Sequence, residues 1–197
     1  MGDKAAQILK TAERLFAAGR YHEVTLDDIC REAAIGKGTI YRYFRDKEDL
    51  FWQVILSGLD ELAEGVQNMG KSEEDPGVGL RRVAACIADF FKARGALFGL
   101  MWSEQFRASP RKRDVRKHWG KKDDDIVAVV AAFIEQGVRE GRYAGCWSPT
   151  ASARLFLGMV RTGLRQQDEM PGGRRWHEEM VNLFERGLLV RDEGKGS

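Results

Sequence analysis

The chain has 197 residues, 43% of them hydrophobic, which suffices for the core of one large or two small domains. The formal net charge is +2, and residues 1–50 carry nine basic and nine acidic side chains, so total charge gives no argument for a nucleic-acid partner. Three isolated cysteines argue against a disulfide framework, and no apolar run approaches the roughly twenty residues of a membrane span, which favours a cytoplasmic protein. No stretch alternates apolar and polar residues, so the sequence predicts an all-α fold.

The first strong local signal is a capped helix that starts just after Thr25. Thr25 and Asp28 have the spacing of a capping box, and Val24 and Ile29 have that of a hydrophobic staple. The apolar residues that follow share one helical face: Leu26, Ile29, Cys30 and Ala33. The pattern predicts a short amphipathic helix.

A tight turn then leads into a second helix. Ile35 is the apolar residue expected to fix the angle between the two helices, and Gly36 is an acceptable N-cap at a cost of roughly a few tenths of a kcal/mol. Ile40 and Phe44 share the inward face of the second helix. Residues 25–44 therefore have the pattern of a helix-turn-helix.

The outward side of the second helix suits the major groove of DNA. Its small and basic residues point outward between two flanking tyrosines: Gly38, Thr39, Arg42 and Arg45, with Tyr41 and Tyr43. Arginine bonds guanine edges, a threonine methyl meets a thymine methyl, and tyrosine hydroxyls reach phosphates. A surface helix with scattered charges is the alternative. The caps, the turn and the local positive charge together favour DNA binding.

A third capped helix follows at once. Asp46 is the expected N-cap, Asp49 completes the box, and Leu50 begins the apolar run. The first N–H groups of this helix and Lys47 form a natural phosphate site. We expect the helix to reach about Asn68 and to join the N-terminal head to the rest without a flexible linker.

Residues 4 to about 55 resemble the DNA-binding domain of the TetR (tetracycline-repressor) family of bacterial transcription regulators. The matching residues are Ile8-Leu9, Ala12, Leu15-Phe16, Gly19, Thr25-Leu26-Asp27-Asp28-Ile29, Lys37-Gly38-Thr39-Ile40-Tyr41, Tyr43-Phe44 and Lys47-Glu48-Asp49-Leu50. Two positions depart from the usual pattern. The family commonly has Gly where Ala34 stands, and Ser or Thr where Gly36 stands.

The resemblance implies which side chains meet DNA. In the family, the residues matching Thr25 and Lys47 typically contact phosphates, and those on the second helix typically meet DNA more generally. With Arg42 added from the helix geometry, the predicted DNA-binding residues are Thr25, Lys37, Gly38, Thr39, Tyr41, Arg42, Tyr43 and Lys47. The expected partner is a palindromic double-stranded DNA operator.

Four loop signals divide the remaining chain into helices: 70–79, 108–110, 141–149 and 168–173. Between them, helical periodicity predicts helices over about 78–93 and 95–107, a long helix that ends near 140, and helices over 149–167 and 173–190. About nine helices are expected in total. Residues 1–50 would form the DNA-binding domain, and residues 51–197 a helical domain for effector binding and dimerisation.

The helix expected over 149–167 is apolar on two sides, and the one over 173–190 carries an apolar stripe. One interpretation is that the helix over 149–167 lies at the centre of a monomer's core. The other is that both helices pair with their copies in a two-fold four-helix interface, as the corresponding helices usually do in the TetR family. We favour the homodimer, because a helix-turn-helix protein gains affinity by reading two half-sites. The predicted interface residues are Leu155, Gly158, Met159, Thr162, Gly163, Trp176, Met180, Leu183, Phe184 and Leu188.

A pocket for a small apolar or aromatic effector is predicted where aromatic residues gather beside a few polar groups. Ordinary core packing is the alternative for each of these residues. The candidate ligand-binding residues are Cys86, Phe90, Phe98, Met101, Trp102, Gln105, Phe106, Phe133 and Met159. The basic run 111–122 fits a solvated surface, with an anionic effector or extra DNA phosphates as sharper alternatives.

Enzymatic chemistry finds little support in the sequence. The three histidines lie far apart, and no phosphate-binding glycine loop or nucleophile elbow occurs. The acidic run Asp123 to Asp125 could hold a divalent cation, but it fits the first turn of an apolar helix more simply. The sequence therefore predicts no enzyme, no metal and no cofactor.

The function predicted from these observations is a homodimeric transcriptional repressor that a small ligand releases from its operator. Within the binding class, the alternative is a regulator or activator whose C-terminal domain only dimerises. From a different class, the alternative is a helical enzyme or chaperone that reuses the fold.

Overall fold

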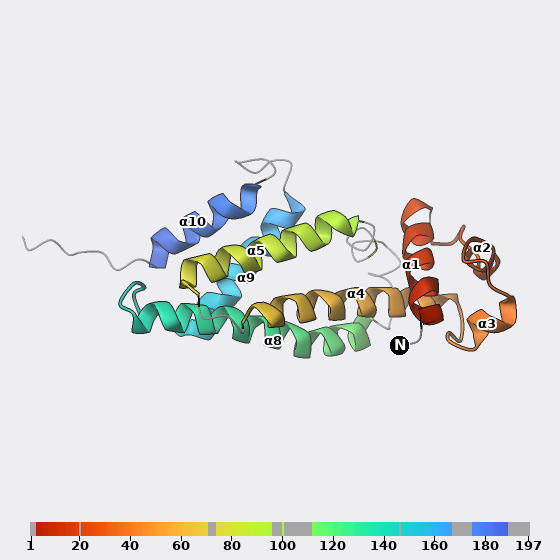
Figure 1. Ribbon diagram of the computed structural model, residues 1–197, viewed down its shortest axis with the longest axis horizontal. Coiled ribbons are helices and arrows are strands. Elements are labelled where there is room, and N and C mark those ends of the chain that lie inside the picture. The colour runs from red at the N-terminus through yellow and green to blue at the C-terminus, as the bar shows by residue number, and fades with distance from the viewer. Residues whose placement is uncertain are drawn as a thin grey trace, which may run out of the picture. The chain divides into compact units, whose positions relative to one another are not determined.

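A computed structural model gives the structure of the chain and describes residues 3–19, 21–70, 74–95, 100, 112–145, 147–166 and 175–188. The described residues form helices and contain no strand, which confirms the all-α prediction. Figure 1 labels these helices, whose bounds are α1 Asp3–Ala18, α2 Leu26–Glu32, α3 Lys37–Tyr41, α4 Lys47–Met69, α5 Pro76–Ala93, α8 Lys112–Arg139, α9 Pro149–Arg165 and α10 Trp176–Leu188. The helix predicted over 95–107 lies almost wholly outside the described residues.

The chain is divided into two compact units. The first consists of Met1–Glu61 and Phe91–Lys122, and the second of Leu62–Phe90 and Asp123–Ser197. The helices α4, α5 and α8 each contribute residues to both units. The functional division at residue 50 remains a prediction, because packing and function need not divide a chain at the same residue.

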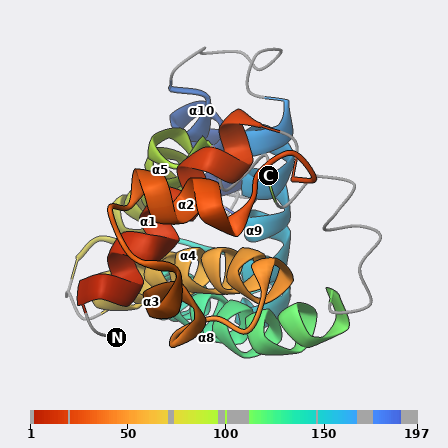
Figure 2. The same cartoon turned by 90° about the vertical axis from the view of Figure 1, so that its right-hand side faces the viewer.

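Aromatic and aliphatic side chains form the core of the N-terminal head, whose helices α1, α2 and α3 face the viewer in Figure 2. Ile8 of α1, Ile29 of α2 and Ile40 of α3 are all fully buried. Phe16 and Phe51 pack edge to face, with ring centroids 5.8 Å apart. This apolar core holds the short helices α2 and α3, which are too short to be stable alone.

The long helix α8 begins before the acidic run Asp123 to Asp125, which was expected to form its first turn. It has 28 residues from Lys112 to Arg139, so Asp123 to Asp125 lie in its interior and the first-turn prediction for them is wrong. No proline interrupts these residues, which lets the helix continue through the basic run. Arg161 of α9 pairs with Asp123, and Arg154 pairs with Asp124 at 2.8 Å, so these acids serve in packing α9 against α8.

The helices α9 and α10 pack tightly against each other within the second unit. Phe156 of α9 and Phe184 of α10 meet at 5.1 Å between ring centroids. Gly163 is buried beneath the ring of Trp176, and a Cβ at this position would overlap that ring. The glycine therefore allows the two helices to approach closely inside one chain.

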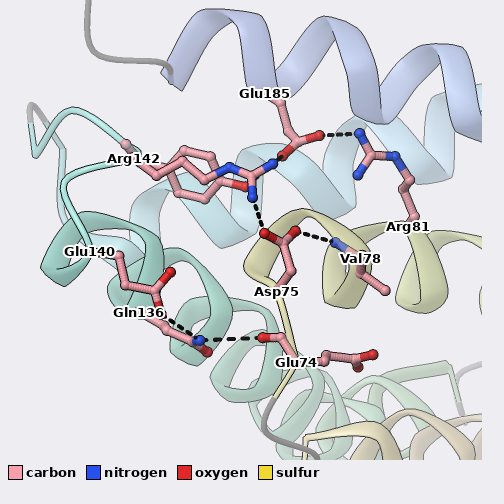
Figure 3. A network of polar contacts seen from close by, with 9 residues as sticks. Glu74, Asp75, Val78, Arg81, Gln136, Glu140, Arg142 and Glu185 are labelled. Carbon is pink, nitrogen blue, oxygen red and sulfur yellow. Dashed lines mark hydrogen bonds and ion pairs between the residues drawn. The ribbon is translucent and has the colours of Figure 1, made fainter.

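A buried carboxylate ties α10 to α5 and to the turn that follows α8 (Figure 3). Glu185 accepts hydrogen bonds from Tyr143 at 2.6 Å, from Arg81 at 2.5 Å and from Arg142 at 3.2 Å. Arg142 also pairs with Asp75, whose other oxygen accepts the backbone N–H of Val78 at 3.1 Å. Burial, followed by the bond to Glu185, raises the pKa of Tyr143.

None of the described helices combines the length and the apolar character that crossing a membrane would require.

Candidate nucleic-acid interface

The start of α2 is capped as its sequence predicted. The Thr25 hydroxyl oxygen accepts the N–H of Asp28 at 3.1 Å, and the Asp28 carboxylate accepts the N–H of Thr25 at 3.0 Å. The hydrogen bonds from Thr25 lower the pKa of Asp28. Val24 and Ile29, the predicted staple residues, are both buried. The reciprocal bonds satisfy two N–H groups at the helix terminus and fix where α2 begins.

The turn between α2 and α3 is a Schellman motif with an alanine in the left-handed position. Ala34 has φ +51°. The N–H of Ile35 donates to the carbonyl of Cys30 at 2.9 Å, and the N–H of Ala34 donates to that of Arg31 at 3.2 Å. Ala34 thus adopts the left-handed conformation that the glycine common at this position in the family would adopt.

The helix α3 is shorter than its sequence predicted. It begins at Lys37 after Gly36, which supplies no side-chain cap bond, and it ends at Tyr41 instead of Phe44. The N–H of Tyr43 donates to the carbonyl of Ile40 at 3.1 Å, which tightens the last turn. The chain turns here because Asp46, the N-cap of α4, follows almost at once.

The outward side of α3 and of the turn that follows it carries large side chains in solvent. Tyr41 is 59% exposed and Tyr43 is 36% exposed, whereas the inward residues Ile40 and Phe44 are buried. Arg42 is exposed, and its guanidinium lies 5.8 Å from the centroid of the Tyr43 ring. Exposed aromatic hydroxyls beside a basic side chain are suited to phosphates and base edges.

The first turn of α3 is open toward solvent. An added Cβ on Gly38 would meet no heavy atom within 4 Å, so the protein leaves space in front of this residue. Lys37 is exposed and pairs with Asp27 of α2 at 2.6 Å, and this bond raises its pKa. The Lys37 ammonium is therefore charged and held at the edge of the outward face, with Thr39 half-buried beside it.

The start of α4 is also capped, with one difference from the predicted box. The Asp46 carboxylate accepts the N–H of Asp49 at 2.7 Å. The Asp49 carboxylate accepts the N–H of Arg45 at 3.0 Å, one residue before the N-cap. Lys47, whose contact with phosphate remains a prediction, donates to backbone carbonyls in the loop between α1 and α2. No local pattern could have indicated these contacts, because they join residues more than twenty positions apart.

The helices α2 and α3, the turn between them and the exposed, partly basic face together form a helix-turn-helix, the kind of element that binds DNA. Residues 8–54 match the family model described as bacterial regulatory proteins, tetR family. These residues therefore form a DNA-binding domain of the tetR family type, and the chain resembles the transcriptional regulators of that family.

Relatives extend this likeness beyond the head. The chain is 25% identical over 207 residues to the uncharacterized HTH-type transcriptional regulator YfiR of Bacillus subtilis, covering 96% of this chain and 94% of that one. It is 28% identical over 174 residues to the HTH-type transcriptional regulator EthR of Mycolicibacterium smegmatis, covering 86% and 78%. The crystal structure of the transcriptional regulator FadR from Bacillus subtilis in complex with stearoyl-CoA has a TM-score of 0.73 at 17% identity, covering 93% of this chain and 98% of that one, so the two share the fold.

An apolar groove of about 580 Å³ lies along α9 and α10. Seven of the ten predicted interface residues line it: Leu155, Gly158, Met159, Thr162, Trp176, Met180 and Leu183. Leu155 is 47% exposed and Leu183 is 66% exposed. The other three predicted residues lie elsewhere, since Gly163 and Phe184 are buried inside the chain and Leu188 is half-buried.

The predicted ligand-binding residues are only partly described. Phe98, Met101, Trp102, Gln105 and Phe106 lie outside the described residues. Phe133 is buried over Gly79, where a Cβ would overlap its ring. Cys86 and Phe90 are half-buried, and burial raises the pKa of the Cys86 thiol. Met159 lines the groove along α9 and α10 and so shares a surface with the predicted interface residues.

Within the described residues, no group of three or more His, Cys, Asp or Glu side chains is placed to hold a metal ion. His118, in the basic run, lies 2.9 Å from Asp60 of α4, and Lys122 lies 3.6 Å from the same carboxylate. Part of the basic run therefore pairs with an acid inside the first unit.

Proposed function

We propose that the chain is a homodimeric repressor that leaves its operator when a small apolar or aromatic ligand binds its C-terminal domain, residues 51–197. The observation that carries the proposal is the outward side of α3 and of the turn that follows it, where Tyr41, Arg42 and Tyr43 are exposed. An activator and a regulator that only dimerises are the competing functions.

DNA would be read by the head through two kinds of contact. Tyr41, Tyr43 and Thr25 would bond phosphates, which fix the position of the protein without reading sequence. Arg42 and Thr39 would meet base edges in the major groove, and Gly38 would let the helix approach closely. Lys37 would exchange its partner Asp27 for DNA.

Dimerisation would bury the apolar groove along α9 and α10 against a second copy. Leu155 and Leu183 are large apolar side chains in solvent on this groove, and such patches on a soluble chain commonly mark an interface. A two-fold dimer would place two α3 helices on successive turns of DNA. The operator is therefore expected to be a near-palindrome with half-site centres on the order of 34 Å apart or somewhat further.

The ligand class is supported by relatives with the same fold. The Bacillus subtilis FadR structure contains stearoyl-CoA, and another relative, 20% identical over 157 residues, is the fatty acid metabolism regulator protein of Bacillus subtilis. A long-chain acyl-CoA thioester is therefore the first compound to test as the effector. Its acyl chain has the apolar character predicted for the ligand.

The experiment selects the DNA that the purified protein binds from a random pool, and then titrates that operator with and without stearoyl-CoA. The repressor proposal expects a near-palindromic consensus and an operator Kd that rises about 5–150-fold with ligand, the usual range of allosteric coupling. Selection of no consensus would reject DNA reading. A consensus with no change of Kd across acyl-CoA and aromatic compounds would favour the regulator that only dimerises.

A further inference from the structure

A side chain of α1 reaches the turn between α2 and α3. The Gln7 amide nitrogen Nε2 donates to the carbonyl oxygen of Ala33 at 3.0 Å, across 26 positions of the sequence. Ala33 is buried, and a buried carbonyl needs a hydrogen-bond donor. Gln7 itself is exposed, so its side chain is not part of the apolar core. The bond therefore serves the turn and not the packing of α1.

The Ala33 carbonyl belongs to the peptide group that precedes the left-handed residue of the turn. The C=O of Ala33 and the N–H of Ala34 lie in one peptide plane. The N–H donates to the carbonyl of Arg31 at 3.2 Å, and the C=O accepts from Gln7, so the plane is held on both sides. Rotation of this plane changes the φ of Ala34, which is +51°. Gln7 therefore holds the residue at which the chain turns from α2 toward α3.

The turn needs such a bond because its left-handed residue is an alanine. A Cβ disfavours this conformation, which glycine adopts freely. Turns with Ala34 at negative φ therefore compete with the observed turn, and each of them would point α3 in another direction. The bond from Gln7 to Ala33 forms in the observed turn and favours it over these competitors.

We propose that Gln7 is a positioning residue for DNA binding, because its bond to the Ala33 carbonyl selects the turn that directs α3 into the major groove. The inference rests on the proposed DNA contacts of α3. The role requires no contact between Gln7 and DNA. Molecules with the observed turn present the outward side of α3 to the operator, and the apparent affinity falls with the fraction of molecules that do so.

Gln7→Met tests this role, because methionine is unbranched and of similar length but has no N–H donor. Operator affinity should fall at least about fivefold, since a smaller fraction of the protein has the competent turn. An affinity within about twofold of wild type would overturn the proposal.

A double-mutant cycle with Ala34→Gly separates positioning from other effects. Glycine adopts the left-handed conformation without help, so Gln7→Met should cost less than about twofold in that background. A direct contact between Gln7 and DNA, or a loosened fold, would lower affinity equally in both backgrounds. Equal losses would therefore reject the positioning role.

Amide hydrogen exchange reports on the turn in the absence of DNA. In Gln7→Met, the N–H groups of Ala34 and Ile35 should exchange at least about fivefold faster, while those within α1 keep their wild-type rates. Arg14→Met is the matched control. It removes an exposed ion pair between α1 and Glu32 of α2 and should leave both turn amides unchanged. Wild-type exchange at both turn amides in Gln7→Met would overturn the proposal.

Gln7→Glu is a second variant should the methionine variant unfold. Its carboxylate has the same shape as the amide but only accepts hydrogen bonds at neutral pH, so it should give the same faster exchange in the turn. Wild-type exchange in this variant would also reject the role. If the wild-type protein selects no operator, the proposed function fails, while the effect of Gln7 on the turn still shows in the exchange rates.

Discussion

Ala34 is the only non-glycine residue with positive φ in the described part of the chain. The left-handed conformation costs a residue with a Cβ roughly 1–2 kcal/mol, and glycine avoids that cost. The Ala34 side chain is exposed, so its loss removes little buried surface. We expect Ala34→Gly to stabilise the protein by about 0.5–1 kcal/mol in chemical denaturation.

The matched control is Ala6→Gly, at an exposed position within α1. A glycine there should destabilise the protein by about 1 kcal/mol, because the helical conformation gains nothing from it. Equal losses for the two variants would show that the turn does not strain Ala34.

Arg42 tests whether α3 reads sequence or only holds the backbone. Arg42→Ala should lower operator affinity by about 1–3 kcal/mol and relax the preference at one base position, if the side chain bonds a base edge. Tyr41→Phe should weaken all sequences about equally, because it removes only a phosphate bond. The measurement is selection from a random pool with each variant. An unchanged consensus with Arg42→Ala would make Arg42 a backbone contact.

The raised pKa of Tyr143 leads us to expect that the free energy of unfolding falls at alkaline pH. Its folded pKa is raised above the unfolded value near 10, first by burial and then by Glu185. The protonated hydroxyl therefore stabilises the fold fully below about pH 10, and this contribution is lost as pH rises above it, at up to about 1.4 kcal/mol per pH unit. Urea unfolding between about pH 8 and 11 measures the slope.

Tyr143→Phe should remove this alkaline slope while costing about 1–3 kcal/mol at neutral pH, because Glu185 loses a donor. Tyr41→Phe, at an exposed tyrosine, is the control that keeps the wild-type slope. An alkaline slope that persists in Tyr143→Phe would place its origin in another group.

At the scale of helices, local patterns predicted the caps well and the tertiary contacts poorly. The boxes around Thr25 and Asp46 depend on groups within four residues, so their sequence sufficed. Gly163 was predicted to lie at the dimer interface, but it packs beneath Trp176 of the same chain. Helical periodicity shows that α9 has two apolar sides, but it does not show which of them faces α10. The contacts of Glu185 join residues more than forty positions apart, and no spacing rule reaches that far.

Gly163 is not a suitable position for testing the proposed dimer, because it packs against Trp176 inside one chain. A large residue there would clash with Trp176 of the same chain and disturb folding. Leu183→Lys is the better variant, because Leu183 is exposed on the groove and its replacement leaves the core intact. Sedimentation should show monomers, and operator affinity should fall at least about tenfold, since one half-site is lost.

Val78→Lys makes the same chemical change at an exposed position of α5 that does not line the groove. This variant should remain a dimer with wild-type operator affinity. A dimer that survives Leu183→Lys would mean that the groove along α9 and α10 is not the interface.

At the scale of the molecule, one arginine connects the segment after α5 to the head. Arg94 follows the last residue of α5, and its guanidinium pairs with Glu13 of α1 and Glu61 of α4. Its Nε donates to Glu13 at 3.1 Å, and Glu13 is buried. A charge pair that is largely removed from water holds its geometry more firmly than an exposed pair does. Movement after α5 would therefore be transmitted to α1.

Arg94→Met should weaken the response of operator binding to the effector. The ratio of operator Kd with and without ligand should fall several-fold toward one, because ligand binding then biases the head less. Glu13→Gln should do the same from the other side of the pair. Arg82→Met, which breaks an exposed ion pair with Glu74 on α5, should leave the ratio unchanged. If Arg94→Met and Arg82→Met give equal ratios, the contact with Glu13 stabilises the head without carrying the signal.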